Sequence, residues 1–402
     1  MIRVEEAEAI IQALVRDFGT ERLPFEQALG RVLAQDLRTD RDLPPFNRVA
    51  MDGIAIRYEA FASGIRTFGI RGTQAAGDSP IDISTIDECV EIMTGAALPP
   101  STDTIIRYED LALQDGQVTV LSEAIQRGQS IHPQGKDRKQ GDVVATANQV
   151  VTAALVGMAA AVGATELEVK RLPRTVVIST GDELVGVEEK PLPYQIRRSN
   201  SYMVKAALQK YGLQADLLHI PDDLKQTKEQ LTHCLQTYDV IILSGGISMG
   251  KFDYVPQVLE ELKVQKLFHK VQQRPGKPFW FGAHASGTVV FALPGNPAST
   301  FMCLHRYFIP WLESSLGIAS RSSLYAVLHA DFTFQPPLQY FLQVKLSISD
   351  SGQLLATPLE GNGSGDFANL IEAGAFLELP AELSEFRRGE VYRVWPFKEP
   401  FV

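Results

Sequence analysis

The sequence predicts a multidomain protein of α/β and β class, with a central doubly wound α/β domain. Residues 173–320 alternate continuous apolar runs with helical segments, the pattern of a parallel sheet covered by helices on both faces. Residues 46–140 and 321–402 carry short β-rich runs separated by Gly, Pro and Asp turns. We therefore expect an inserted β domain and a C-terminal small β-barrel domain.

Two segments that flank the inserted β domain indicate a helical and β linker domain. Residues 1–45 contain apolar residues at helical spacing, and Leu43-Pro44-Pro45-Phe46 then enforces extended backbone. Residues 141–172 carry a β run followed by a further helical pattern. We assign both segments to one domain, into which residues 46–140 are inserted. Its predicted helices are Glu5–Phe18, Pro24–Leu37 and Val151–Val162.

The central domain is predicted element by element from its changing periodicity. Continuous apolar runs are typical of parallel strands buried on both faces. Ligands of such sheets bind at the carboxyl ends of the strands. The predicted strands are Thr175–Ser179, Ala215–Ile220, Asp239–Leu243 and Thr288–Ala292, and the predicted helices are Ser201–Tyr211, Leu224–Leu235, Tyr254–Leu262 and Ala298–Leu316.

Composition restricts the classes of function. The net charge of -10 and the pI of about 5.3 argue against nucleic acid as the main partner, because a basic footprint is expected there. The three cysteines form no CxxC pair, which argues against disulfides and a zinc cluster. No apolar run reaches the roughly 18 residues of a membrane span, and Met1–Glu6 does not resemble a signal peptide. We expect a soluble cytoplasmic protein.

Two Gly-rich turns predict an anion site in the central domain. Ser244-Gly245-Gly246-Ile247-Ser248 and Leu293-Pro294-Gly295-Asn296-Pro297 each follow an apolar strand and precede a helix. Glycines let backbone N–H groups point inward, and the helix start adds positive potential. A purely structural turn is the alternative, since Asn296 can cap a helix that Pro297 begins. Ser299 lies in the first turn of that helix.

Charged residues near these turns predict ligand contacts. Arg274-Pro275-Gly276-Lys277-Pro278 places two cations around a rigid turn, which would attract a phosphate locally, although a surface turn explains it equally. Glu183, Asp222 and Asp253 follow predicted strands or open a helix. They are candidate ligands of Mg²⁺, which takes one or two carboxylates together with phosphate oxygens. Turn capping remains the alternative at each position.

Taken together, these segments resemble the MoeA family of molybdopterin molybdenumtransferases, which includes the gephyrin E domain. Eight motifs occur in the family's order, over nearly the whole chain. They are Ala28–Leu33, Pro44-Pro45-Phe46 with Ala50-Met51-Asp52-Gly53, Ile92–Ala96, Ser179–Leu184, Ser199–Tyr202, Ser244–Tyr254, Pro275–Pro278 and Leu293–Ser299.

The resemblance implies a step of molybdenum cofactor biosynthesis. Molybdenum from molybdate is inserted into adenylylated molybdopterin, and AMP is released by hydrolysis with Mg²⁺. It also implies a homodimer whose active site combines the α/β domain of one subunit with the β region of the other. The residues that match the family's motifs are Asp52, Thr94, Asp137, Glu183, Asp222, Asp253, Lys277, Pro294 and Pro297. Of these, Asp52, Thr94, Asp137, Glu183 and Asp253 would serve catalysis.

Several positions depart from the family's pattern, and they leave an alternative open. Asn47, Arg48, Lys136, Arg198, Lys251 and Gln343 stand where the family usually has residues of other charge, and Arg274 stands where Lys is usual. A degenerate paralogue could therefore bind molybdopterin or a partner without turnover. A nucleotide-processing enzyme that uses only the α/β domain is a third reading, and the matching segments at 28–33, 50–53 and 92–96 count against it.

Overall fold

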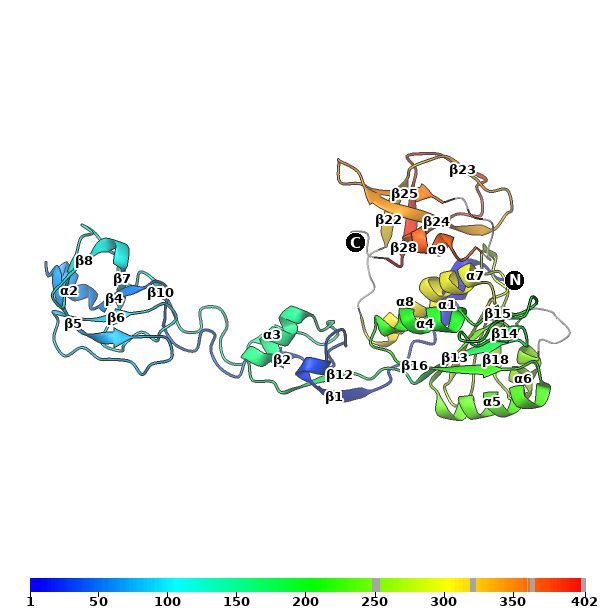
Figure 1. Cartoon of the computed structure of the whole chain (residues 1–402), viewed down its shortest axis with the longest axis horizontal. Coiled ribbons are helices and arrows are strands. Elements are labelled where there is room, and N and C mark those ends of the chain that lie inside the picture. The colour runs from blue at the N-terminus through cyan, green and yellow to red at the C-terminus, as the bar shows by residue number, and fades with distance from the viewer. Residues whose placement is uncertain (248–253, 319–322, 360, 362–365, 399–402) are drawn as a thin grey trace. The chain divides into compact units, whose positions relative to one another are not determined.

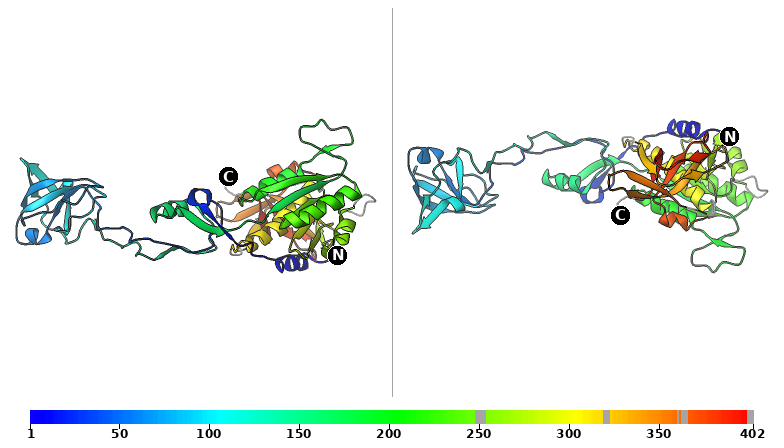
Figure 2. Two further views of the ribbon diagram at one scale, coloured as in Figure 1. Left: turned by 90° about the horizontal axis from the view of Figure 1, so that it is seen from below. Right: turned by 90° about the horizontal axis from the view of Figure 1, so that it is seen from above.

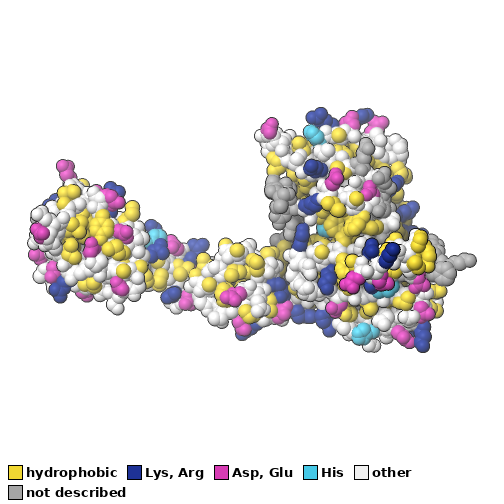
Figure 3. Space-filling model, viewed as in Figure 1, with side chains coloured by type: hydrophobic (Ala, Val, Ile, Leu, Met, Phe, Trp, Pro, Cys, Tyr) yellow, Lys and Arg dark blue, Asp and Glu magenta, His cyan; other side chains and the backbone are white. Residues whose placement is uncertain are grey.

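The computed structural model describes residues 1–247, 254–318, 323–359, 361 and 366–398. The chain divides into two compact units (Figures 1 and 2). The first comprises residues 1–34, 148–152 and 167–402, and the second comprises residues 35–147 and 153–166. Among the described helices, none is long and apolar enough to cross a membrane. In Figure 3, acidic and basic side chains are interspersed on the visible face of both units.

A six-stranded sheet forms the centre of the first unit, in the order β16-β13-β17-β21-β20-β18. The four strands β16, β13, β17 and β21 are parallel, which confirms the doubly wound α/β domain. The antiparallel pair β18 and β20 completes the sheet and was not among the predicted strands. The strands are β13 (Thr175–Thr180), β16 (Ala215–Ile220), β17 (Val240–Ser244), β18 (Gln265–His269), β20 (Trp280–Ala283) and β21 (Val289–Leu293).

Helices cover both faces of this sheet. Neighbouring residues of a strand point to opposite faces, so an apolar strand exposes side chains on both sides that helices must bury. Val177 belongs to the core beneath one set of helices, whereas Val176 and Ile178 belong to the core beneath the other. The first core receives α1 (Val4–Gln12), α4 (Asn200–Gln209), α7 (Pro297–Cys303), the π-helical segment η3 (Leu304–Phe308) and α8 (Ile309–Ser315). The second receives α5 (Leu224–Thr237) and α6 (Val255–Glu261).

The helix predicted over Pro24–Leu37 is wrong. Residues Thr20–Pro24 form β1, and a single 3-10 turn over Phe25–Gln27 follows. Gly30 then adopts a φ of 77°, a left-handed conformation that interrupts a helix. Val32 and Leu33 consequently form isolated bridges to Val150 and Val169 instead of continuing a helix. Strand β12 (Glu166–Lys170) pairs with β1, and α3 (Ala153–Ala161) lies within the predicted third helix.

The C-terminal part of the first unit is a closed small β-barrel, as predicted. Its sheet has the order β19-β24-β25-β22-β28-β26, and β24 also pairs with β26, which closes the ring. Strand β19 (Gln273–Arg274) comes from the central domain and pairs with Gln339 and Tyr340 of β24. The other elements are β22 (Leu324–Leu328), β23 (Phe332–Thr333), β24 (Gln339–Ile348), β25 (Leu354–Pro358), α9 (Asn369–Glu372), β26 (Ala375–Leu379), β27 (Glu385–Phe386) and β28 (Val391–Pro396).

The second unit contains a six-stranded sheet in the order β7-β4-β6-β5-β9-β8. Its two faces bury separate apolar clusters, one around Ile54 and Phe68 and one around Ala55 and Val90. The strands are β4 (Gly53–Ile56), β5 (Thr67–Gln74), β6 (Glu88–Ile92), β7 (Thr104–Arg107), β8 (Leu111–Gln114) and β9 (Gln117–Val120), with α2 (Tyr58–Ala62) alongside. Short pairs join β2 (Leu37–Arg38) to β11 (Val143–Ala145) and β3 (Arg48–Val49) to β10 (Ile131–His132). This confirms the predicted β domain.

Candidate functional site

The two Gly-rich turns lie side by side at the carboxyl end of the central sheet. Strands β17 and β21 pair in parallel with Ser244 opposite Leu293, so the turns that follow them leave the sheet together. The Gly245 N–H donates to the Leu293 carbonyl over 3.2 Å. A Cβ on Gly295 would lie 3.6 Å from the Gly245 Cα. The sequence predicted that both turns contribute to one anion site, and the parallel pairing of β17 and β21 places them side by side.

Asn200, the first residue of α4, connects these two turns. Its Nδ2 donates to the Ser244 Oγ over 2.9 Å and to the Gly295 carbonyl over 2.6 Å. The same atom lies 3.3 Å from the Thr300 Oγ1 of α7. The side chain therefore holds three segments of the central domain in one arrangement. Sequence reasoning quoted Asn200 only as part of a family motif and gave it no role.

The absence of side chains at Gly245 and Gly246 is a steric requirement. Both have positive φ, 98° and 69°, which disfavours other residues. A Cβ on Gly246 would lie 2.5 Å from the Thr180 Oγ1 at the end of β13. The Thr180 Oγ1 and the Asn200 Oδ1 are buried polar atoms without a hydrogen-bond partner among the described residues. Unsatisfied buried polar groups cost free energy, and a ligand that binds at the site is one explanation for such atoms in a native protein.

Carboxylates gather at the ends of β13 and β16. The Asp222 N–H donates to the Asp182 Oδ1 over 3.0 Å, and the Asp182 N–H lies 3.4 Å from the Asp222 Oδ2. Glu183 folds back over this turn, since a Cβ on Gly181 would lie 2.3 Å from its Oε2. No group of three metal-binding side chains occurs within the described ranges. Two carboxylates alone, Glu183 and Asp222, would not complete the coordination of Mg²⁺, which would need phosphate oxygens as further ligands.

Two of the predicted site residues, Ser248 and Asp253, lie outside the described residues, and so does Lys251, which departs from the family pattern. At the second turn, Asn296 occupies the position before α7, but its side chain makes no capping hydrogen bond. Pro297 begins α7 as predicted, Gly295 is exposed, and Pro294 and Ser299 are buried. In this arrangement the Gly295 backbone is more accessible to a ligand than the Ser299 hydroxyl.

The turn with two cations, residues 274–278 and called the cationic turn below, lies where the central domain meets the C-terminal barrel. Arg274 and Lys277 are exposed, whereas Gln273, Pro275 and Gly276 are buried. The Arg274 guanidinium lies 5.7 Å from the centroid of the Phe334 ring. A pocket of about 100 Å³ opens beside it, lined by Arg274, Pro275, Ala298, Tyr340, Phe341, Gln343, Leu359 and Gly361. Burial raises the pKa of the Tyr340 hydroxyl, so this phenol stays neutral and adds no negative charge to the pocket.

The Gln343 side chain gives this pocket an unsatisfied acceptor. Its Oε1 is buried and has no hydrogen-bond partner among the described residues. An amide can also donate, so Gln343 remains able to contact an oxyanion, although it carries no charge. Arg198, another position that departs from the family pattern, has a buried Nε without a described partner.

The second unit holds its own predicted site residues. The Thr94 N–H donates to the Asp52 carboxylate over 2.6 Å. This bond and one from the Thr94 hydroxyl lower the pKa of Asp52, which keeps the carboxylate ionised at neutral pH. Asp137 lies beside His132, with 2.9 Å between its Oδ1 and the imidazole Nε2. Asn47 accepts a hydrogen bond from the Gln134 N–H, Arg48 is exposed on β3, and Lys136 is exposed.

Family models match three consecutive parts of the chain. Residues 2–163 match the MoeA N-terminal region (domain I and II). Residues 176–314 match a probable molybdopterin binding domain. Residues 325–397 match the MoeA C-terminal region (domain IV). The three matches follow the order that the motifs predicted.

Individual proteins show the same similarity over nearly full length. The chain is 40% identical to the molybdopterin molybdenumtransferase of Synechocystis sp., over 98% of this chain and 99% of that protein. It is 30% identical to the protein of the same name in Staphylococcus epidermidis, over 98% and 95%. Among solved structures, a molybdopterin biosynthesis MoeA protein from Pyrococcus horikoshii is 29% identical, with a TM-score of 0.84 over 99% of this chain and all of that one.

Proposed function

The chain belongs to the MoeA family, and from this premise we propose that it is a molybdopterin molybdenumtransferase. The proposed reaction inserts molybdenum from molybdate into adenylylated molybdopterin, while water cleaves the phosphoanhydride and AMP leaves. The observation that carries the proposal is the pair of Gly-rich turns that Asn200 holds together at the carboxyl end of the sheet. Backbone N–H groups and adjacent cations suit a substrate with a pterin phosphate and a phosphoanhydride.

The cationic turn supplies the charge for the anionic substrates. Arg274 borders the 100 Å³ pocket, and we propose that molybdate enters there, with the Gln343 amide as a neutral contact. Lys277, on the same turn, would neutralise the phosphate of the pterin substrate. Pro294, Gly295, Asn296, Pro297 and Ser299 complete this edge together with Ser244, Gly245, Gly246 and Ser248. The role of the proline residues is to fix the turn, since they cannot donate a hydrogen bond.

Two carboxylates suit the hydrolytic half of the reaction. Glu183 and Asp222 would hold Mg²⁺ together with phosphate oxygens, and Asp253 is proposed as a third ligand from the family motif. Such a cation neutralises charge that develops on the phosphoanhydride. Asp182 holds the Asp222 backbone in place through its own carboxylate. Glu183 and Asp253 would also orient the water that attacks the phosphoanhydride.

We further propose a homodimer in which Asp52, Thr94 and Asp137 of one subunit complete the site of the other. The proposed domains are 1–45 with 141–172, 46–140, 173–320 and 321–402. The lowered pKa of Asp52 supports its role as a permanently ionised group. A mixing experiment tests this arrangement: Asp52→Asn subunits are combined with Lys277→Ala subunits. Activity recovers in the mixture if sites are shared, because one site of each mixed dimer is intact.

Release of AMP from adenylylated molybdopterin tests the proposed reaction itself. Wild-type protein with Mg²⁺ is expected to release AMP faster once molybdate is added. Lys277→Ala is expected to lose this stimulation, whereas Lys225→Ala, which removes an exposed lysine on α5, retains it. Folded wild-type protein that shows no stimulation by molybdate refutes the reaction.

A binding protein without turnover is the second candidate, and the neutral Gln343 in the pocket favours it. The loss of a cation there would weaken stabilisation of charge during the reaction more than binding of the pterin. Calorimetric titration with molybdopterin distinguishes the two. Tight binding together with absent AMP release supports the second candidate.

A further inference from the structure

The buried side chain of Gln273 connects the cationic turn to the helix that packs against it. Gln273 is fully buried, and its Nε2 donates to the Gly276 carbonyl over 3.0 Å. The same Nε2 lies 3.6 Å from the Cys303 Sγ. Its Oε1 accepts a hydrogen bond from the Tyr307 hydroxyl. Gln273 thus connects the start of the turn, its centre and the helix below.

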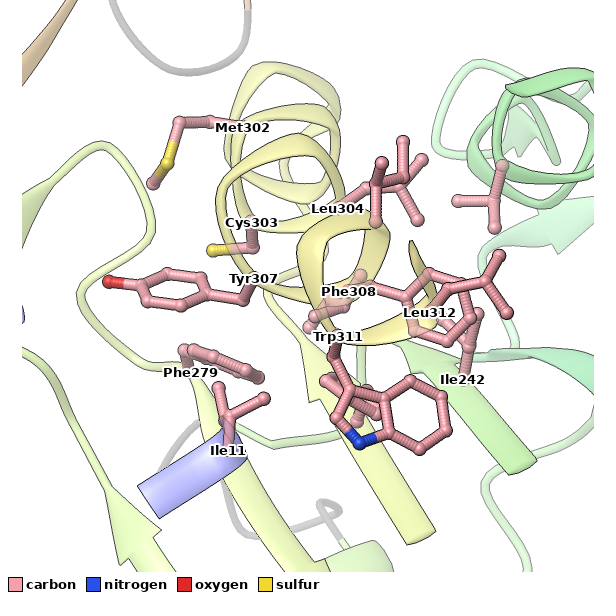
Figure 4. Close-up of a cluster of buried hydrophobic side chains, with 14 of the residues drawn as sticks. Ile11, Ile242, Phe279, Met302, Cys303, Leu304, Tyr307, Phe308, Trp311 and Leu312 are labelled. Carbon is pink, nitrogen blue, oxygen red and sulfur yellow. The ribbon is translucent and has the colours of Figure 1, made fainter. Parts of the chain in front are cut away.

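Tyr307 reaches Gln273 from an irregular part of that helix. It lies in the π-helical segment η3 (Leu304–Phe308), between α7 and α8. A π-bulge changes the direction of the side chains around it, and such bulges occur frequently at functional sites. Figure 4 shows the Tyr307 ring extending from the helix on the same side as Cys303, next to Phe279. Burial raises the pKa of Tyr307 far above its ordinary value, so the hydroxyl remains a donor.

The turn packs closely against the helix below it and pairs with the barrel beside it. Gly276 has a φ of 90°, and a Cβ there would lie 2.7 Å from the Cys303 Sγ and 2.8 Å from the Met302 Cε. On the other side, Arg274 pairs with Tyr340 of β24. The two exposed cations, Arg274 and Lys277, are therefore carried by a backbone that is fixed on both sides.

We propose that Tyr307 and Gln273 are positioning residues for anion binding, acting through the turn on Arg274 and Lys277. This inference rests on the proposed function of that turn. Binding is tighter when the binding groups are already held in place, because less ordering remains to be done. If the Tyr307 hydroxyl is removed, the buried Gln273 Oε1 loses its donor, and the turn must move for that atom to find another. The cations then lose their fixed spacing.

The test is Tyr307→Phe, which removes one oxygen and keeps the ring. Binding is measured by titration calorimetry with sodium molybdate at constant ionic strength. We expect affinity to fall about tenfold, the effect of roughly 1.4 kcal/mol. Tyr211→Phe is the matched control, since it removes a hydroxyl that bonds to Glu313 instead. That variant should bind as the wild type does.

A double-mutant cycle separates positioning from general weakening of the fold. If Tyr307 acts through the cations, Tyr307→Phe should have little further effect in a chain that already carries Arg274→Ala and Lys277→Ala. Additive effects, or unchanged affinity in Tyr307→Phe alone, overturn the inference. Tryptophan fluorescence verifies that each variant is folded. Should Tyr307→Phe unfold, Gln273→Met takes its place, since it removes the bonds to the Tyr307 hydroxyl and to the Gly276 carbonyl at similar side-chain length. Its molybdate affinity is then measured alone and in the chain that lacks both cations.

The wild type and Lys277→Ala distinguish failure of the inference from failure of the proposed function. Molybdate binding that Lys277→Ala weakens and Tyr307→Phe leaves unchanged overturns the inference alone. Absence of molybdate binding to the wild type, with Lys277→Ala also leaving the KM for adenylylated molybdopterin unchanged, overturns the proposed role of the turn. The inference then falls with it.

Discussion

Replacement of Asn200 by Asp tests how the two Gly-rich turns are held together. The change keeps the shape of the side chain but removes the Nδ2 donor. The Ser244 hydroxyl can rotate to donate to the new carboxylate. The Thr300 hydroxyl already donates to the Pro294 carbonyl, and the Gly295 carbonyl, 2.6 Å from Nδ2, cannot donate. Loss of that bond and the unfavourable contact between two oxygens should destabilise the first unit by about 2–3 kcal/mol.

Urea unfolding followed by tryptophan fluorescence measures this loss. The three tryptophans, Trp280, Trp311 and Trp395, all belong to the first unit, so the signal reports on that unit alone. The expected loss should lower the urea midpoint by about 1 M, given ordinary m-values. Asn148→Asp is the matched control, because it adds the same charge at an exposed position of the same unit.

The pH dependence of Asn200→Asp provides a second, signed test. The adjacent carbonyl and partial burial should raise the pKa of the introduced carboxyl above its unfolded value of about 3.9. A raised carboxyl pKa destabilises the fold at high pH, and this deficit disappears as pH falls through the folded pKa. The difference from wild type should therefore shrink between pH 7 and pH 5. An unchanged midpoint at pH 7, or a deficit that grows on acidification, refutes the proposed role of Asn200.

Three further predictions use the same fluorescence assay. Gly276→Ala should destabilise the first unit by about 2 kcal/mol, because its φ is 90° and the new Cβ would meet the Cys303 Sγ at 2.7 Å; wild-type stability would contradict this. Arg306→Met should cost about 3 kcal/mol, since it leaves Glu378, which Arg306 approaches to 3.6 Å, without its buried cation. Arg393→Met should cost far less, because Arg393 is only half-buried over the Trp395 ring. Burial lowers the pKa of His305 from 6.5 to about 4. The free energy of unfolding should therefore fall by about 1–2 kcal/mol between pH 8 and pH 5, because the unfolded chain binds the His305 proton at higher pH than the folded chain does. His305 is only half-buried, which limits this loss. His305→Gln should abolish the pH dependence.

The sequence by itself determined the class of the central domain. Runs such as Thr175–Ser179 and Asp239–Leu243 have continuous apolar centres, which is typical of parallel strands buried on both faces of a sheet. It also located the two Gly-rich turns, since they follow these strands directly. Positive φ at Gly245 and Gly246 then gives the reason why glycine stands there.

Tertiary structure alone decided how these parts form a site. Asn200 contacts residues 44, 95 and 100 positions away, and Tyr307 contacts a residue 34 positions away. Local periodicity carries no information about hydrogen bonds between such distant side chains. For the same reason Val32 and Leu33 suggested a helix, although their partners are Val150 and Val169. The pattern of apolar residues specifies which face is buried, and long-range pairing specifies against what it is buried.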